Sequence, residues 1–221
     1  MPVEKTWMSA LAAVAVGMLG GCQLSPESSL EPLPPHRLAL WRRPATPERP
    51  RKTVASDAGR WRADGYRQWR YIVIHHSAGD YGNAAAFDAD HRGRGWDELG
   101  YHFVIDNGNG GPDGHVEVGS RWTKQKWGAH CGGTPNNEYN NHGIGICLVG
   151  NFCEKMPTPA QQGALRRLVQ HLATRHNIPA EHVVGHCDCP GAHTACPGRF
   201  LLRWINGKFR LQLQNYLARV E

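Results

Sequence analysis

Short apolar runs separated by polar turns recur along the chain from about residue 71 onward. Residues 71–74, Tyr-Ile-Val-Ile, are apolar without interruption and rich in β-branched side chains, which predicts a buried strand. The alternation of Val116, Glu117 and Val118 predicts the return strand of a hairpin, because residues 106–114 consist of turn-forming Asn, Asp, Gly and Pro. The remaining apolar runs predict strands over 101–105, 143–149 and 182–184.

Helical patterns fill the positions between these runs. Residues 83–91 predict a helix that glycines interrupt soon afterwards. Thr158, Pro159 and Gln161 predict a helix start, with Thr at N-cap, Pro at N1 and Gln at N3. This helix should end near Asn177, and its apolar residues lie on one face: Ala164, Leu165, Leu168, Val169 and Leu172.

Strands interleaved with helices predict an α/β fold, a single domain in which helices flank a mixed central β-sheet. We place this domain at residues 61–206, followed by a C-terminal extension at 207–221 that includes a helix. The whole chain has 221 residues and is 40% hydrophobic, which suits one domain with a substantial core. Seven prolines and several arginines crowd residues 23–60, which predicts an extended linker that buries little apolar surface.

The first 22 residues resemble an export signal. Lys5 precedes an apolar run over 7–19 that is too short to span a bilayer comfortably. The run ends in Leu19-Gly-Gly-Cys22, which resembles a bacterial lipobox, so Cys22 is the predicted lipidation site. Export with lipid anchoring to a bacterial membrane follows, and by the same resemblance Gln23 favours the periplasmic side of the outer membrane. The alternative is an ordinary secretory signal in which Cys22 has no role.

The balance of charges restricts the partners. A formal net charge of +6 and an isoelectric point near 9.1 make the surface mildly basic, which suits an anionic cell-wall polymer or a lipid surface. The chain lacks a dense Lys/Arg motif with interleaved aromatic residues, so nucleic acid is not an expected partner. We expect a monomer.

Candidate metal ligands lie far apart in the chain. His75 follows the first predicted strand, and a loop bearing Pro and Gly separates His186 from Cys196 by ten positions. Two imidazoles and one thiolate would supply three zinc ligands and leave the fourth position for water, as in catalytic sites. Cys187 and Cys189 are rival ligands that would close a structural zinc site, and they are also candidates for a disulfide.

His76 is a further alternative to His75. Successive side chains of a strand point to opposite faces of the sheet, so only one of these two histidines can face a metal ion.

Six segments of the chain form a pattern. They are, in order, Ile72-Val-Ile-His-His-Ser-Ala78, Gly100-Tyr-His-Phe103, Trp127-Gly-Ala-His130, Asn141-His-Gly-Ile-Gly-Ile-Cys-Leu-Val-Gly150, Thr158-Pro-Ala-Gln161, and Gly185-His186 through Thr194-Ala-Cys196-Pro-Gly198. In this order they resemble the zinc amidase family of phage amidase lysozymes, bacterial type-2 N-acetylmuramoyl-L-alanine amidases and animal peptidoglycan recognition proteins. The resemblance covers roughly residues 71–204.

This resemblance implies hydrolysis, dependent on Zn2+, of the amide between N-acetylmuramic acid and L-alanine in peptidoglycan or muropeptides. The implied zinc ligands are His75, His186 and Cys196, and the implied catalytic residues are Tyr101 and Thr194. The alternative is a non-catalytic peptidoglycan-binding module, because animal members that lack the last Cys ligand bind wall fragments without cutting them. The presence of Cys196 favours the enzyme.

The resemblance also implies that His130 and His142 line the substrate groove, although both can equally be surface residues. Where some bacterial members carry a glutamate that serves as a general base, this chain has Cys147, which favours the tyrosine-assisted mechanism. Core packing is predicted, rather than stacking on sugar rings, for three tryptophans: Trp96, Trp122 and Trp127.

Overall fold

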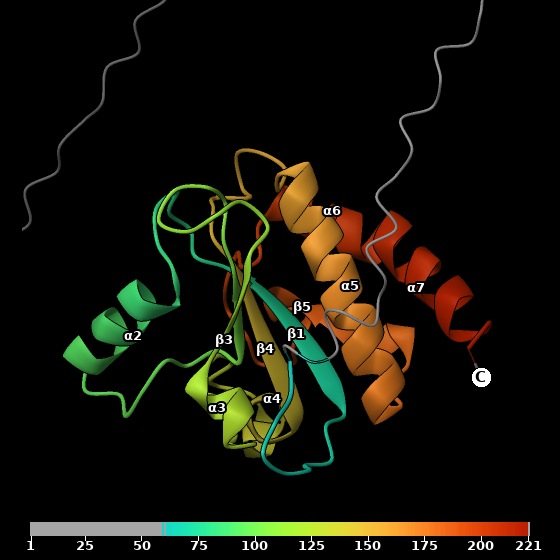
Figure 1. Cartoon of the computed structure of the whole chain (residues 1–221), viewed down its shortest axis with the longest axis horizontal. Helices are drawn as coiled ribbons and strands as arrows, with labels where there is room; N and C mark the ends of the chain where they lie inside the picture. The colour runs from blue at the N-terminus through green and yellow to red at the C-terminus, as the bar shows by residue number, and fades with distance from the viewer. Residues whose placement is uncertain (1–58, 60, 221) are drawn as a thin grey trace, which may run out of the picture. The chain divides into compact units, whose positions relative to one another are not determined.

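A computed structural model describes Gly59 and residues 61–220 of the chain. The predicted signal at 1–22, with Cys22, lies outside the described residues, and so does nearly all of the linker predicted at 23–60. The described part contains five strands in one sheet, in the order β3-β2-β4-β1-β5 (Figure 1). Their bounds are β1 (Tyr71–His76), β2 (Phe103–Ile105), β3 (Val116–Val118), β4 (Gly143–Leu148) and β5 (Val183–Gly185).

The sheet is mixed. β1 pairs in parallel with both β4 and β5, β2 pairs in parallel with β4, and β3 alone runs antiparallel, as the second strand of the β2–β3 hairpin. The predicted α/β fold with a mixed sheet and flanking helices is therefore confirmed. β1 extends two residues beyond the predicted run, because His75 and His76 still pair with Cys147 and Leu148 of β4.

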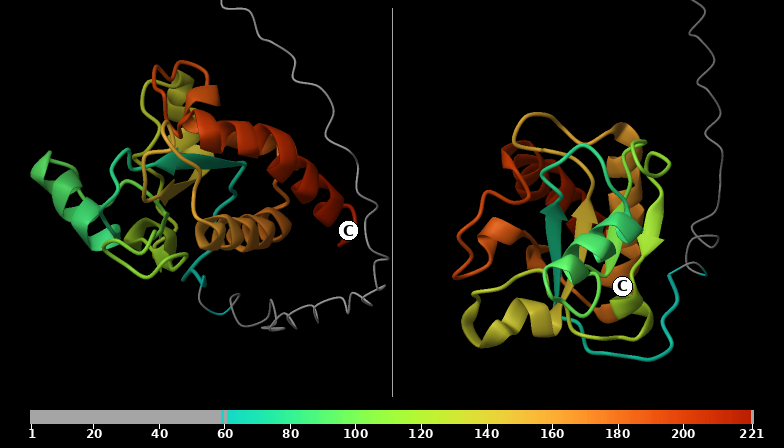
Figure 2. Two further views of the ribbon diagram at one scale, coloured as in Figure 1. Left: turned by 90° about the horizontal axis from the view of Figure 1, so that it is seen from above. Right: turned by 90° about the vertical axis from the view of Figure 1, so that its left-hand side faces the viewer.

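The helices lie on opposite sides of this sheet. Figure 1 and Figure 2 show α5 (Pro159–His176) and α7 (Arg210–Leu217) on one side and α2 (Ala84–Gly93) on the other. The shorter helical segments are α3 (Ser120–Thr123), η1 (Pro135–Asn137), α4 (Glu138–His142), η2 (Ala180–His182), η3 (His186–Asp188), α6 (Arg199–Trp204) and the π-helical turn η4 (Ile205–Phe209).

The main core lies between the sheet and α5. Alternate strand residues such as Ile72, Ile146 and Phe103 point to this side, where they meet the apolar face of α5. That face is the predicted one: Ala164, Leu165, Leu168, Val169 and Leu172 are all fully buried.

The ends of α5 form as the sequence predicts. The Thr158 hydroxyl accepts a hydrogen bond from the Gln161 amide at 3.0 Å, and the Gln161 side chain accepts one from the Thr158 amide at 3.1 Å. This reciprocal capping box satisfies backbone donors that the first helical turn leaves free. Asn177 ends the helix in the left-handed region at φ 51°, a conformation that asparagine tolerates better than most residues.

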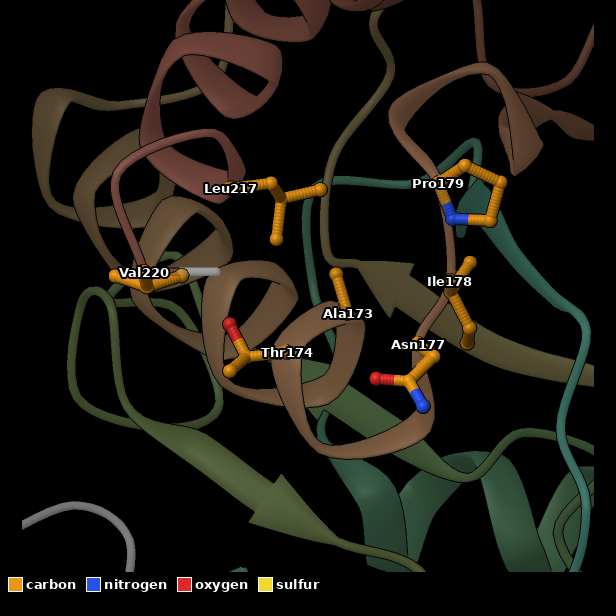
Figure 3. Close-up of a pocket in the computed structure, with 7 residues that line it drawn as sticks. All are labelled: Ala173, Thr174, Asn177, Ile178, Pro179, Leu217 and Val220. Carbon is orange, nitrogen blue, oxygen red and sulfur yellow. The ribbon is translucent and has the colours of Figure 1, made fainter.

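The C-terminal helices pack on the same core. Phe209 and Leu213, within the extension predicted at 207–221, are each 1% exposed and belong to the main hydrophobic cluster. Where α7 passes the end of α5, Leu217 and Ile178 help to line a surface pocket of about 340 Å³ (Figure 3). In the portion of the chain described by the structure, none of the helices combines the length and apolar character that crossing a membrane requires.

The three tryptophans differ in burial. Trp122 is 1% exposed and packs in the main core, as predicted. The prediction was wrong for Trp96 and Trp127, which are 41% and 51% exposed. Trp96 stacks on the His91 ring and Trp127 lies beneath the Lys126 ammonium group, so polar side chains rather than the core support both indoles.

Candidate metal centre

Three predicted ligands converge at one edge of the sheet. His75 lies near the carboxyl end of β1, and His186 directly follows the adjacent parallel strand β5, so both imidazoles emerge at the same edge. Their ring centroids are 4.6 Å apart. The loop after β5 brings Cys196 back to them. Among the described residues, these three form the one group whose donor atoms could hold a metal ion, with all three atoms within 4.8 Å of one another.

The spacing of these donors fits zinc. Zinc bonds of ~2.0–2.1 Å to nitrogen and ~2.3 Å to sulfur, at tetrahedral angles, place the two ligand atoms about 3.6 Å apart. The distance between His75 Nδ1 and Cys196 Sγ is 3.6 Å. Burial raises the pKa of the Cys196 thiol to about 12, so deprotonation of this thiol at neutral pH requires a cation nearby. Two imidazoles and one thiol are also the donor types that zinc prefers.

His76, the alternative to His75, points to the other face of the sheet. Its Nδ1 accepts a hydrogen bond from the Phe152 amide at 3.2 Å, and its ring lies beside the Phe152 ring in the main core. Cys187 and Cys189, the rival ligands, are not in the metal-capable group that the described residues form. Cys189 instead has its thiol beside that of Cys131, in a small buried cluster.

His130 makes a direct contact with His75. Its Nδ1 lies 3.1 Å from His75 Nε2, and its Nε2 lies 3.2 Å from the carbonyl oxygen of Gly143. Both imidazoles are buried, and burial is the main cause that lowers the pKa of each well below its usual value. The structure thus places His130 behind a candidate ligand, and its predicted role in substrate binding stays a prediction.

Tyr101 lies on the other flank of His75, with the two ring centroids 5.2 Å apart. Its hydroxyl interacts with the Cys147 side chain. Burial raises the pKa of Tyr101 well above its usual value, and negative charge on Cys147 or Cys196 would raise it further. The phenol therefore stays protonated at neutral pH and is available as a hydrogen-bond donor.

Thr194 and His142 are the last two predicted site residues. The Thr194 hydroxyl is on the exposed loop before Cys196 and accepts a hydrogen bond from the Cys196 amide at 3.1 Å. His142 immediately precedes Gly143, which pairs with Tyr71 at the opposite end of β1 from His75. The roles predicted for Thr194 and His142 stay predictions.

Reasoning from the sequence missed Asn140 altogether. Its side-chain oxygen accepts hydrogen bonds from the backbone amides of His130 and Cys131, both at 2.8 Å. Asn140 is 6% exposed and lies in α4, ten residues from His130. Asn140 is one of five asparagines between positions 136 and 151, and nothing in its sequence context distinguishes it from its neighbours.

Comparison with known proteins identifies the family. The family model described as N-acetylmuramoyl-L-alanine amidase matches residues 65–199. An N-acetylmuramoyl-L-alanine amidase of Sus scrofa is 33% identical over 105 residues, which are 44% of this chain but only 16% of the pig protein. A peptidoglycan-recognition protein of Drosophila simulans is 33% identical over 146 residues, covering 60% of this chain and 70% of the fly protein.

A solved structure agrees in both fold and sequence. The endolysin N-acetylmuramoyl-L-alanine amidase LysCS from Clostridium intestinale superposes with a TM-score of 0.54 at 30% identity, over 64% of this chain and 83% of that one. The matched residues include β1, the hairpin, β4, α5 and the loop that carries the last two metal-ligand candidates. By its sequence and its fold, this chain belongs to the N-acetylmuramoyl-L-alanine amidase family.

Proposed function

We propose that this protein is a zinc-dependent hydrolase that cleaves the amide between N-acetylmuramic acid and L-alanine in peptidoglycan. The observation that carries the proposal is the convergence of His75, His186 and Cys196 at the spacing of zinc ligands. A site of three protein ligands has one coordination position left for water or substrate, which distinguishes catalytic from structural zinc sites. Membership of the amidase family indicates which bond is cleaved.

The chain's own residues assist the reaction. When bound, zinc supplies Lewis acidity, which polarises a carbonyl group and lowers the pKa of water. Tyr101, protonated and 5.2 Å from His75 between ring centroids, donates a hydrogen bond to the oxygen on which negative charge develops. Thr194 can serve the same purpose. Its hydroxyl oxygen accepts a hydrogen bond from the Cys196 amide, which leaves the hydroxyl hydrogen free to donate. Each such donor is typically worth roughly 2.7–4 kcal/mol in the transition state.

Cys196 favours hydrolysis over binding alone. A module that only binds wall fragments has no need for a complete ligand set, whereas this chain keeps a half-buried thiol beside two imidazoles. With the thiol present, the three donors suffice for zinc. Peptidoglycan or a soluble muropeptide is therefore proposed as a substrate rather than only as a ligand.

The experiment is product analysis of digested peptidoglycan. Purified protein loaded with zinc is incubated with peptidoglycan, and the released peptides are examined by mass spectrometry. We expect peptides with a free L-alanine amino terminus, and loss of these products after treatment with a chelator. Full activity of metal-free protein would refute the role of zinc.

Two cysteine variants make a matched pair. Cys196→Ala should abolish both zinc binding and hydrolysis, whereas Cys189→Ala should retain both, because the thiol of Cys189 lies beside Cys131 and outside the metal-capable group. If Cys189→Ala loses zinc and Cys196→Ala keeps it, the ligand set is wrong. If zinc is bound but no product forms, the protein is a binding module.

The proposed location rests on the sequence alone. Leu19-Gly-Gly-Cys22 after a short apolar run supports export and lipid anchoring to a bacterial membrane, which would bring the enzyme close to the cell wall. Cys22→Ser should move the protein from the membrane pellet to the soluble fraction. Retention of that variant in the pellet would contradict the anchor.

A further inference from the structure

A chain of hydrogen bonds extends from His75 away from the metal-ligand candidates. His75 Nδ1 faces Cys196, while His75 Nε2 faces His130 Nδ1 at 3.1 Å. His130 Nε2 in turn faces the carbonyl oxygen of Gly143 at 3.2 Å. The chain therefore joins a candidate ligand to the backbone of β4 through a second buried imidazole.

The carbonyl at the end of this chain fixes the direction of every bond in it. A carbonyl oxygen only accepts, so His130 Nε2 carries the hydrogen and donates to Gly143. In a neutral imidazole the other nitrogen, His130 Nδ1, is then an acceptor. It accepts from His75 Nε2, which must carry the hydrogen of His75. His75 Nδ1 is left with a free lone pair, and this is the atom that faces Cys196.

The structure holds the His130 ring in a close-fitting slot. A methyl group added at either Gly128 or Gly145 would overlap ring atoms of His130, so only glycine fits on these two sides. The backbone of His130 is fixed as well, because its amide donates to Asn140 Oδ1 at 2.8 Å. The ring is thus positioned by a glycine in β4, a glycine in the preceding loop and a buried amide in α4.

Cys131, the residue after His130, contacts the other candidate imidazole ligand, His186. Cys131 donates its amide hydrogen to the same Asn140 oxygen at 2.8 Å, and its thiol interacts with the side chain of His186. Both histidines of the metal-capable group therefore have an outer partner from the dipeptide His130-Cys131. Outer partners of this kind set the tautomer and ring orientation of histidine ligands.

We propose that His130 is a positioning residue, which holds His75 in the tautomer and orientation that leave Nδ1 free for a metal ion. The proposal rests on the proposed function in so far as it takes His75 as a zinc ligand. It assigns no contact between His130 and substrate. The glycines at 128 and 145 are, on this view, required because they make room for the positioning ring.

The first test needs no metal. Two-bond proton–nitrogen correlation spectra of the metal-free protein at pH 8 report which nitrogen of each neutral histidine carries hydrogen, and His75→Asn identifies the signals of His75. We expect hydrogen on Nε2 of both His75 and His130. Hydrogen on Nδ1 of His75 would overturn the proposal whether or not the protein binds zinc.

The second test compares zinc affinities by competition with a chelator. In His130→Asn, the side-chain oxygen can take the place of Nδ1 and still accept from His75, whereas His130→Leu has no acceptor. His176→Leu is the matched control, because this buried histidine has no hydrogen-bond partner on either ring nitrogen among the described residues. Circular dichroism and thermal unfolding of the metal-free variants establish that each is folded.

We expect the zinc dissociation constant to rise ~10–100-fold in His130→Leu, the usual effect of removing such a partner. It should stay within about threefold of the wild type in His130→Asn and in the His176→Leu control. Equal affinity in wild type and a folded His130→Leu overturns the proposal, as does equal weakening in the Asn and Leu variants, which would show that His130 only fills space. If the wild type binds no zinc, the proposed function fails, and if His130→Leu does not fold, the spectra and His130→Asn decide the proposal.

Discussion

Replacement of Asp106 by asparagine should stabilise the protein at neutral pH. Asp106 directly follows β2 and is 1% exposed. Its Oδ2 lies 3.2 Å from His115 Nδ1, but its Oδ1 is buried without a hydrogen-bond partner among the described residues. Burial raises the pKa of Asp106 to about 6, and the nearby negative charge of Glu117 contributes to the rise. Ionisation of this carboxylate therefore destabilises the folded state, at a cost in the free energy of unfolding.

The shift gives the size of this cost. An increase from 3.8 to about 6 is about two pKa units, and one unit corresponds to about 1.4 kcal/mol, so the cost approaches ~3 kcal/mol. At pH values below 3.8 both the folded and unfolded states hold the proton, and the cost is absent. Between about pH 4 and 6 the unfolded state loses the proton first, so the free energy of unfolding falls as the pH rises. Above about pH 6 the full cost applies.

Asp106→Asn keeps the shape of the side chain, removes the charge and can donate from its amide to the Glu117 carboxylate. Urea unfolding followed by tryptophan fluorescence, with zinc removed by a chelator, should give a variant more stable than the wild type by up to ~3 kcal/mol at pH 7.5. The difference should shrink towards pH 4. Asp64→Asn is the control, because it removes the same charge from an exposed position. A variant no more stable than the wild type at pH 7.5, or a difference that is independent of pH, would refute the reasoning.

Three further predictions concern the site and the core. Tyr101→Phe should lower kcat on muropeptides by ~10²–10³-fold, because one hydrogen-bond donor to the transition state is lost. Zinc affinity, measured by chelator competition, should stay unchanged. A weaker zinc site would mean that Tyr101 supports the ligands instead. Gly145→Ala should lower the free energy of unfolding by roughly 1–3 kcal/mol, because the added methyl group overlaps the His130 ring. Denaturant unfolding checks this, and an unchanged midpoint would show that the ring moves freely. Leu168→Ala, at a fully buried position of α5, should cost about 2–5 kcal/mol in the same assay without changing zinc affinity.

The elements that the sequence predicted well are those that short-range rules determine. Asn83 accepts a hydrogen bond from the Ala86 amide and starts α2, and the Thr158 capping box starts α5. These signals lie within three residues of the position they control. The strand bounds were less accurate: β1 continues through His76, where the partner is a distant strand and the side chains are no longer apolar. Pairing between strands, rather than local hydrophobicity, decides where β1 ends.

The candidate ligands could be chosen from the sequence only because the resemblance to the amidase family pointed to His75 and His186 together, although they are 111 residues apart. Spacing alone left Cys187 and Cys189 as rivals, and only the path of the loop after β5 separates them from Cys196. The environment of His130 could not be predicted from the sequence, for a related reason. Its contact with His75 depends on a ring orientation that two glycines and Asn140 produce together, from three different elements.

The strand β4 combines the requirements of the core and of the site. On the side of α5 its residues are large, Ile144, Ile146 and Leu148, and they fill the main core. On the other side they are small, Gly143, Gly145 and Cys147.

A strand with large residues on both faces would bury more apolar surface, yet it would leave no space for the buried side chains that surround His75. Gly145 instead admits the His130 ring, and Cys147 contacts the Tyr101 hydroxyl. The period-two alternation of size in Gly-Ile-Gly-Ile-Cys-Leu is therefore a sequence signature of a strand that supports a core on one face and a metal-capable site on the other. It follows that enlarging Gly145 should lower both zinc affinity and stability, whereas truncating the large residues should lower stability without changing zinc affinity.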